Sequence, residues 1–132
     1  MKKTISISCF VILMLTTKAY AQSNLTWTLK DNIQKGYFKS HTTFNTSLSG
    51  FTSKDQATKL LSKIKANPEV ASAEVSNVDA NGNSDLKLVM KSAHDKMYYV
   101  GLVQKLGVEY IVANGKKQTP AQIIEEKRLK AN

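Results

Sequence analysis

The side chains with the most obvious chemical use lie close together in the sequence, around residue 94. His94 and Met97 are three positions apart at the start of a predicted helix, and Met90 ends the strand before it. Imidazole and thioether groups can hold Cu(I), so these three residues are the candidate metal ligands. Structural roles explain them better, because Met90 continues an apolar alternation, Met97 can pack on a sheet and His94 suits a first helical turn. We therefore expect no bound metal.

Ser53 and Asp55 are the next candidates, as a nucleophile and a general base. No histidine lies near Ser53 in the sequence to activate its hydroxyl. Ser53 and Gln56 instead have the spacing of a capping box, and Asp55 falls in the first turn of the helix that such a box begins. The other carboxylates are scattered, and the glycines form no phosphate-binding loop. The sequence predicts neither an enzyme nor a cofactor.

The first 21 residues have the pattern of a secretory signal peptide. Two lysines precede an apolar run over residues 5–15, and Ala19-Tyr20-Ala21 forms a small-x-small cleavage site. A run of this length is too short to span a bilayer, which takes roughly 20 residues. We expect cleavage after Ala21 and export to a periplasm, with secretion beyond it as the alternative.

Export would leave a chain without cysteine and with a moderate positive charge. The one cysteine, Cys9, lies in the signal peptide, so the mature chain offers neither a disulfide nor a thiolate ligand. The signal peptide also holds three of the 19 basic residues and none of the 10 acids, which leaves the mature chain at +6. Its lysines are spread along the sequence beside a single arginine, Arg128. This distribution argues against nucleic acid as a partner, and we expect no membrane span after cleavage.

Apolar periodicity and capping residues define the elements that follow residue 42. Alternation predicts strands over residues 44–48, 70–78, 86–91 and 108–113. A first helix is predicted between Ser53 and Pro68, with an apolar stripe that includes Leu60 and Ile64. A second begins at Ser92, which has the capping-box spacing to Asp95, and ends at Gly107. A third begins at Thr119-Pro120.

This order of elements predicts an α+β fold of the ferredoxin-like βαββαβ type, a four-stranded antiparallel sheet with two helices on one face. The chain then divides into a signal peptide (residues 1–21), an N-terminal extension (22–41), the ferredoxin-like domain (42–114) and a turn with a C-terminal helix (115–132). Leu25, Trp27 and Leu29 alternate in the extension and allow a short edge strand. Residues 30–39 fit either a helix or a loop.

The stretch from Gly50 to Ser76 resembles the heavy-metal-associated domain of copper chaperones and metal-transporting ATPases. Gly50 and Thr52 stand where that family has its motif glycine and threonine. Ser53 and Gln56 replace the two cysteines that bind the metal. The resemblance therefore implies the fold of that family without its metal site.

Together these observations predict an exported, non-catalytic binding or interaction module, built on a heavy-metal-associated-like scaffold that has lost its cysteine site. Its partner would be a protein of the cell envelope, for example one that adds a strand to the sheet edge. The alternative is a periplasmic accessory protein that handles copper-type metals through His94, Met90 and Met97.

Overall fold

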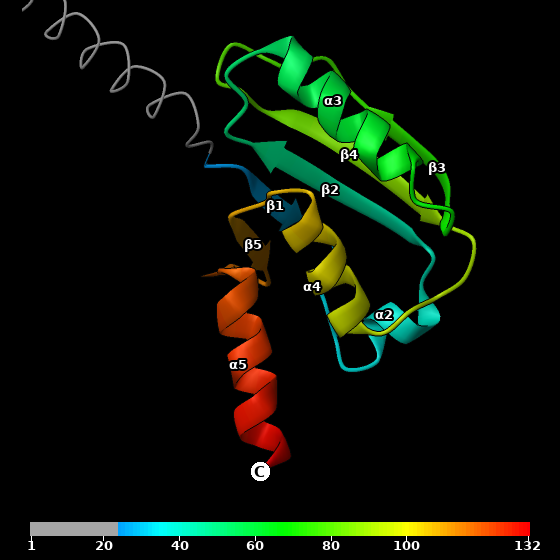
Figure 1. Cartoon of the computed structure of the whole chain (residues 1–132), viewed down its shortest axis with the longest axis vertical. Helices are drawn as coiled ribbons and strands as arrows, with labels where there is room; N and C mark the ends of the chain where they lie inside the picture. Colours follow the sequence, from blue (N-terminus) through cyan, green and yellow to red (C-terminus); the bar gives the residue numbers. More distant parts are fainter. Residues whose placement is uncertain (1–23) are drawn as a thin grey trace, which may run out of the picture.

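Alternating apolar residues and helix-capping residues build six strands and four helices in the computed structural model, which describes residues 24–132 (Figure 1). The strands are β1 (Thr26–Leu29), β2 (Thr43–Ser49), β3 (Val70–Val75), β4 (Ser84–Met90), β5 (Tyr110–Ala113) and β6 (Lys116–Gln118). The helices are α2 (Tyr37–Ser40), α3 (Lys54–Lys65), α4 (Lys96–Lys105) and α5 (Pro120–Ala131). The predicted signal peptide, with its cleavage site at Ala19 and Ala21, lies outside the described residues. Within residues 24–132, no helix has the length and apolar character needed to cross a membrane.

The strands form one mixed sheet in the order β3-β4-β2-β1-β5-β6. Neighbouring strands are antiparallel except β1 and β5, which run parallel. The prediction of a four-stranded antiparallel ferredoxin-like sheet with two helices is therefore wrong. The prediction fails because β1 lies between β2 and β5. In the predicted fold, those two strands would be neighbours.

The position of β1 also corrects the expectation of an edge strand. Trp27 in β1 lies opposite Leu48 of β2 and opposite Ile111 of β5. Leu25 and Trp27 are both buried in the core. Because the alternation puts apolar residues on one face and threonines on the other, this short segment suits a strand with one face covered.

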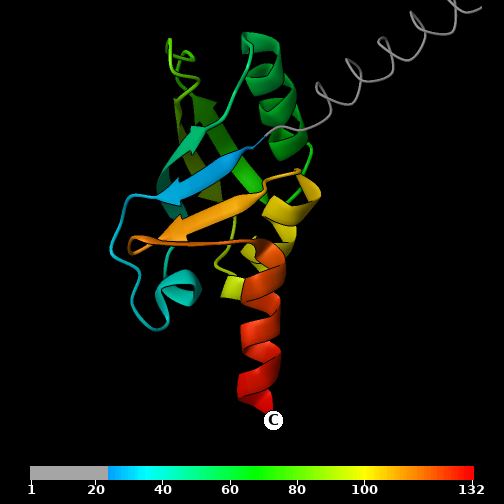
Figure 2. The ribbon, with the colours of Figure 1, turned by 90° about the vertical axis from the view of Figure 1, so that its left-hand side faces the viewer.

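Helices cover one face of the sheet only, as Figure 2 shows for α3, α4 and α5. The covered face carries the core residues, among them Phe44, Leu48 and Leu88. On the other face, strand pairing sets Thr28 beside Ser47, and Asn45 beside Lys87. That face is polar, which allows it to meet water without a covering layer.

The capping signals placed two helices correctly and one helix start wrongly. Ser53 and Thr119 are the N-caps of α3 and α5, as predicted, and Thr119 forms a complete capping box with Gln122. α4 begins later than predicted, because Asp95 rather than Ser92 is its N-cap and accepts a hydrogen bond from the Tyr98 N–H at 2.9 Å. Carboxylates and hydroxyls are both good caps, so the sequence alone allows two possible starts.

Two strands also depart from their predicted form. β3 ends at Val75 rather than residue 78. Strict alternation predicts Ala71 on the same inward face as Ala73 and Val75, but an irregularity in the pairing with β4 between Val70 and Ser72 leaves Ala71 exposed. A bulge of this kind shifts the side-chain alternation by one residue. β6 was not predicted, because Lys116, Lys117 and Gln118 carry no apolar alternation and form a strand through backbone pairing with β5.

Candidate functional site

The loop that resembles a metal-binding motif serves the start of α3. Ser53 Oγ accepts a hydrogen bond from the Gln56 N–H at 3.4 Å, and Gln56 Oε1 accepts one from the Thr52 N–H at 2.8 Å. Both side chains are therefore used to satisfy backbone donors that a helix start leaves unpaired. Gly50, at a φ of 98°, lets the chain turn against Asn24, whose carbonyl oxygen would lie 2.3 Å from an added Cβ.

The structure gives His94 and Met90 separate surroundings. His94 Nε2 lies 3.3 Å from Glu69 Oε2, and its ring stacks on Tyr98 at a centroid distance of 3.9 Å. Met90 is in the core with 2% of its surface exposed, and Met97 is half-buried on the first turn of α4. Within residues 24–132, no group of three or more His, Cys, Asp or Glu side chains could hold a metal ion. The expectation of no bound metal stays a prediction, with binding through His94, Met90 and Met97 as its alternative.

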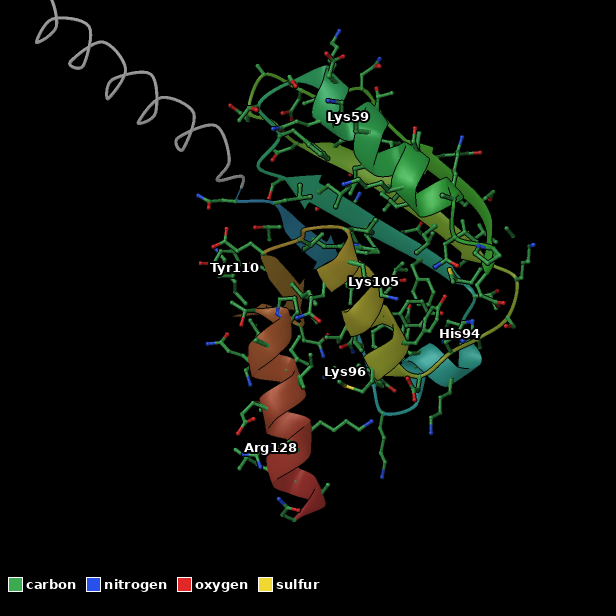
Figure 3. All side chains as sticks on the ribbon, viewed as in Figure 1. Lys59, His94, Lys96, Lys105, Tyr110 and Arg128 are labelled. Carbon is green, nitrogen blue, oxygen red and sulfur yellow. The ribbon has the colours of Figure 1, made fainter. Side chains whose placement is uncertain are left out.

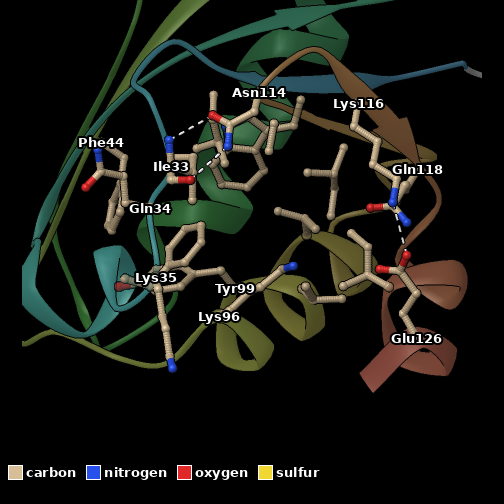
Figure 4. A pocket seen from close by; sticks show the side chains of 18 of the residues that line it. Ile33, Gln34, Lys35, Phe44, Lys96, Tyr99, Asn114, Lys116, Gln118 and Glu126 are labelled. Carbon is tan, nitrogen blue, oxygen red and sulfur yellow. Dashed lines mark hydrogen bonds and ion pairs between the residues drawn. The ribbon is translucent and has the colours of Figure 1, made fainter. Parts of the chain in front are cut away.

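A cavity of about 830 Å³ lies elsewhere, between the covered face of the sheet, residues 33–39, α4 and α5 (Figure 4). Its volume falls within the range of pockets that hold small molecules, roughly 300–1,000 Å³. Most of its lining is apolar and comes from several elements, including Trp27 and Leu29 of β1, Phe44 of β2, Tyr99 and Val103 of α4 and Ile111 of β5.

Aromatic side chains pack together along one side of this cavity. The Tyr99 ring lies 4.9 Å from the Phe44 ring and 5.3 Å from the Phe38 ring, measured between centroids. Burial raises the pKa of the Tyr99 hydroxyl. The nearby backbone amide of His94 acts in the opposite direction and lowers this pKa, although the two groups do not form a hydrogen bond of good geometry. The hydroxyl therefore stays neutral at physiological pH.

Asn114, in the turn after β5, joins that turn to the segment after β1 at one end of the cavity. The Ile33 N–H donates to Asn114 Oδ1, and Asn114 Nδ2 donates to the Ile33 carbonyl, both at 2.8 Å (Figure 4). Asn114 has a φ of 52° and is followed by Gly115 at 76°, so the two form the tight turn between β5 and β6. The Asn114 side chain in this turn thus fixes the position of the segment that follows β1.

The segment from Asp31 to His41 has its own internal support. The Tyr37 hydroxyl donates to Asp31 Oδ2 at 2.6 Å, and the His41 ring stacks on the Tyr37 ring at a centroid distance of 4.0 Å. Burial, followed by the hydrogen bond and the negative charge of Asp31, raises the pKa of Tyr37 to about 12. Phe38, next in sequence, is then presented to the cavity.

α5 closes the cavity on the side away from α2. Its buried residue Ile123 lines the cavity, and Lys116 Nζ binds Glu126 Oε1 at 3.0 Å, which joins α5 to β6. The hydrogen bond from Lys116, then one from Gln118, lowers the pKa of Glu126. Glu126 is the only carboxylate among the lining residues, all of which belong to the described part of the chain; none of them is a histidine, cysteine or serine.

Two polar atoms buried beside the cavity have no hydrogen-bond partner among residues 24–132, Trp27 Nε1 and Tyr99 Oη. Trp27 has 5% of its surface exposed and lines the cavity. An unpaired buried donor costs about 1–3 kcal/mol, so such groups normally find a partner. Both atoms are fully buried, so neither is exposed to the free space of the cavity.

Comparison with protein-family models, curated proteins and solved structures finds no match to this chain. The site therefore rests on its own geometry. Sequence analysis missed the cavity because its walls come from segments far apart in the chain. The one signal in the sequence was Trp27, the single tryptophan, within an alternating segment whose strand partners the sequence does not determine.

Proposed function

We propose that this chain is a non-catalytic module that binds a small molecule in the cavity between β1, β5, residues 33–39, α4 and α5. The observation that carries the proposal is the cavity of about 830 Å³ itself, whose lining includes the half-buried apolar residues Leu29, Phe38 and Ile111. The apolar lining would supply most of the affinity, and the few polar groups would orient the ligand.

The cavity is a better binding site than the uncovered face of the sheet. That face is rich in threonine, serine, asparagine and charged side chains, such as Thr28, Asn45 and Lys87, and so gives an envelope protein little apolar surface to bury. The predicted signal peptide supports export, so the proposed ligand is one present in a periplasm or outside the cell.

The test uses N-phenyl-1-naphthylamine, a neutral probe that fluoresces in apolar surroundings, with energy transfer from Trp27 as the readout. We expect one probe molecule per chain. Ala113→Phe would fill part of the cavity and weaken binding by about tenfold, in line with the loss of several apolar contacts.

Val112→Phe is the matched control, because Val112 pairs with Thr28 and Lys117 on the uncovered face of the same strand. Its affinity for the probe should equal that of the unmodified chain. Absence of energy transfer, or equal weakening by the two variants, would contradict the proposal.

A further inference from the structure

The charges around the cavity are strongly one-sided. Five lysines line it, at positions 35, 39, 96, 116 and 130, against a single acid, Glu126. Lys116 binds Glu126 at 3.0 Å. The four others form no ion pair with a carboxylate within residues 24–132, and they come from three separate elements, the segment around α2, α4 and α5. Clefts lined by one sign of charge concentrate ligands of the opposite sign.

Lys96 has the position that matters most for a ligand. It is the first residue of α4, where a positive charge opposes the helix dipole, so its place is not explained by the stability of the helix. Figure 4 shows the Lys96 side chain extending across the opening of the cavity, whereas Lys35 points away from it. A lysine can keep its apolar stem on such a wall while its ammonium group meets a polar head.

The deeper part of the cavity has a different character. Leu29, Phe38 and Ile111 line it, are half-buried and offer apolar surface to a ligand. A ligand that satisfies both parts has an apolar body and one acidic head. Its body would lie against the sheet and its head at the lysines.

We infer that the ligand is an anionic amphipath, with one acid group held by Lys96 and the neighbouring lysines and an apolar body in the cavity beside Trp27. This inference rests on the proposed function and names its ligand class. The acid group is a carboxylate or a phosphate, since a lysine ammonium binds either as a point charge.

The experiment compares ligands with one tail and different heads. Dodecanoate, dodecyl phosphate, 1-dodecanol and dodecylamine, each below its micelle concentration, compete with N-phenyl-1-naphthylamine for the purified chain. We expect the acids to bind about tenfold or more tightly than the alcohol, as a charge-assisted contact provides, and the amine to bind most weakly. The ratio of dodecanoate to dodecyl phosphate affinity distinguishes a carboxylate from a phosphate ligand.

Lys96→Gln tests the assignment of the head group. We expect it to remove most of the advantage of the acid over the alcohol while leaving the affinity for the alcohol unchanged. Lys105→Gln is the control, because it removes the same charge from the other end of the same helix, outside the cavity lining (Figure 3). It should leave both affinities unchanged.

The outcomes separate the two proposals. If acid and alcohol bind equally and Lys96→Gln has no effect, the anionic ligand class is wrong while the binding function stands. The ligand class is also wrong if Lys105→Gln weakens acid binding as much as Lys96→Gln does, because the attraction would then be one of net charge alone. If the probe binds but none of the four ligands displaces it, the ligand class is wrong while the binding function stands. If the probe itself does not bind and no ligand changes Trp27 fluorescence, the proposed function itself is wrong.

Discussion

Asn114 and Ile33, 81 positions apart in the sequence, are joined by a pair of hydrogen bonds of 2.8 Å between one side-chain amide and one backbone residue. The pair works like a short stretch of strand pairing, because the amide offers the same donor and acceptor as a peptide group. It fixes the segment after β1 to the β5–β6 turn at the edge of the cavity. Exchange of the Ile33 amide and the shape of the cavity should therefore both depend on this side chain.

Asn114→Gly should loosen the cavity wall without disturbing the turn. Glycine accepts the φ of 52° at this position but removes both hydrogen bonds to Ile33. We expect the free energy of unfolding to fall by about 1–3 kcal/mol, at about 0.5–1.5 kcal/mol for each hydrogen bond. Faster hydrogen exchange at the Ile33 amide and weaker probe binding would accompany it.

Asn114→Asp is the partner variant for this prediction. A carboxylate still accepts from the Ile33 N–H but cannot donate to the Ile33 carbonyl. Its effect on exchange at Ile33 should be smaller than that of Asn114→Gly. Equal exchange rates in all three proteins would show that the pair does not restrain the segment.

Gly50→Ala should be much more costly than Gly36→Ala. Both glycines have positive φ, 98° and 79°, but only an added Cβ at Gly50 would meet other atoms, with the Asn24 carbonyl oxygen at 2.3 Å. Gly36→Ala should cost roughly 1 kcal/mol, whereas Gly50→Ala adds the movement of backbone at the start of β1. Urea unfolding of the two variants measures the difference. Similar costs would mean that residues 24–25 do not lie against Gly50.

Ile64→Ala and Leu60→Ala should each lower the free energy of unfolding by about 2–5 kcal/mol, because they leave cavities between α3 and the sheet. Ile64 has 1% and Leu60 6% of its surface exposed. Lys63→Ala, on the exposed side of the same helix, should change stability by less than about 0.5 kcal/mol. Denaturant unfolding with an unchanged slope would check all three. A near-zero cost for both apolar variants would contradict the packing of α3.

Stability at high pH should depend on Tyr37. Because the folded state raises its pKa to about 12 from the usual value near 10, its contribution is present in full below pH 10 and is lost as the pH rises toward 12. The free energy of unfolding of the unmodified chain should fall more steeply over this range than that of Tyr37→Phe. Ultraviolet titration of tyrosinate absorbance would show one high-pKa group fewer in the variant. Identical pH profiles would contradict the Asp31–Tyr37 contact.

Local signals in the sequence predicted the elements whose own residues determine them. The stripe of Leu60 and Ile64 and the caps Ser53 and Thr119 placed α3 and α5, because a helix closes its hydrogen bonds within itself. The alternation of Leu25, Trp27 and Leu29 allowed a strand, which the structure places inside the sheet and not at its edge. The strands that pair with this segment could not be predicted, since the pairing of β1 with both β2 and β5 depends on residues far along the chain.

The cavity could not be predicted for a related reason. Lys35 and Lys39 lie far from Lys96 and from Lys130 in the sequence, and all four look like separate solvated charges. Only the fold brings them to one cavity. The short segment of Lys116, Lys117 and Gln118 shows the same limit, because it becomes a strand only when β5 is beside it.

The parallel pairing of β1 with β5 has a consequence for synthesis of the chain. Thr26 is paired with Tyr110, so one edge of β1 stays open from the time it leaves the ribosome until nearly the whole chain has followed. An open strand edge is a template for pairing with other chains. A nascent chain, or one truncated before residue 110, would therefore expose the centre of the future sheet and depend on a chaperone to remain monomeric.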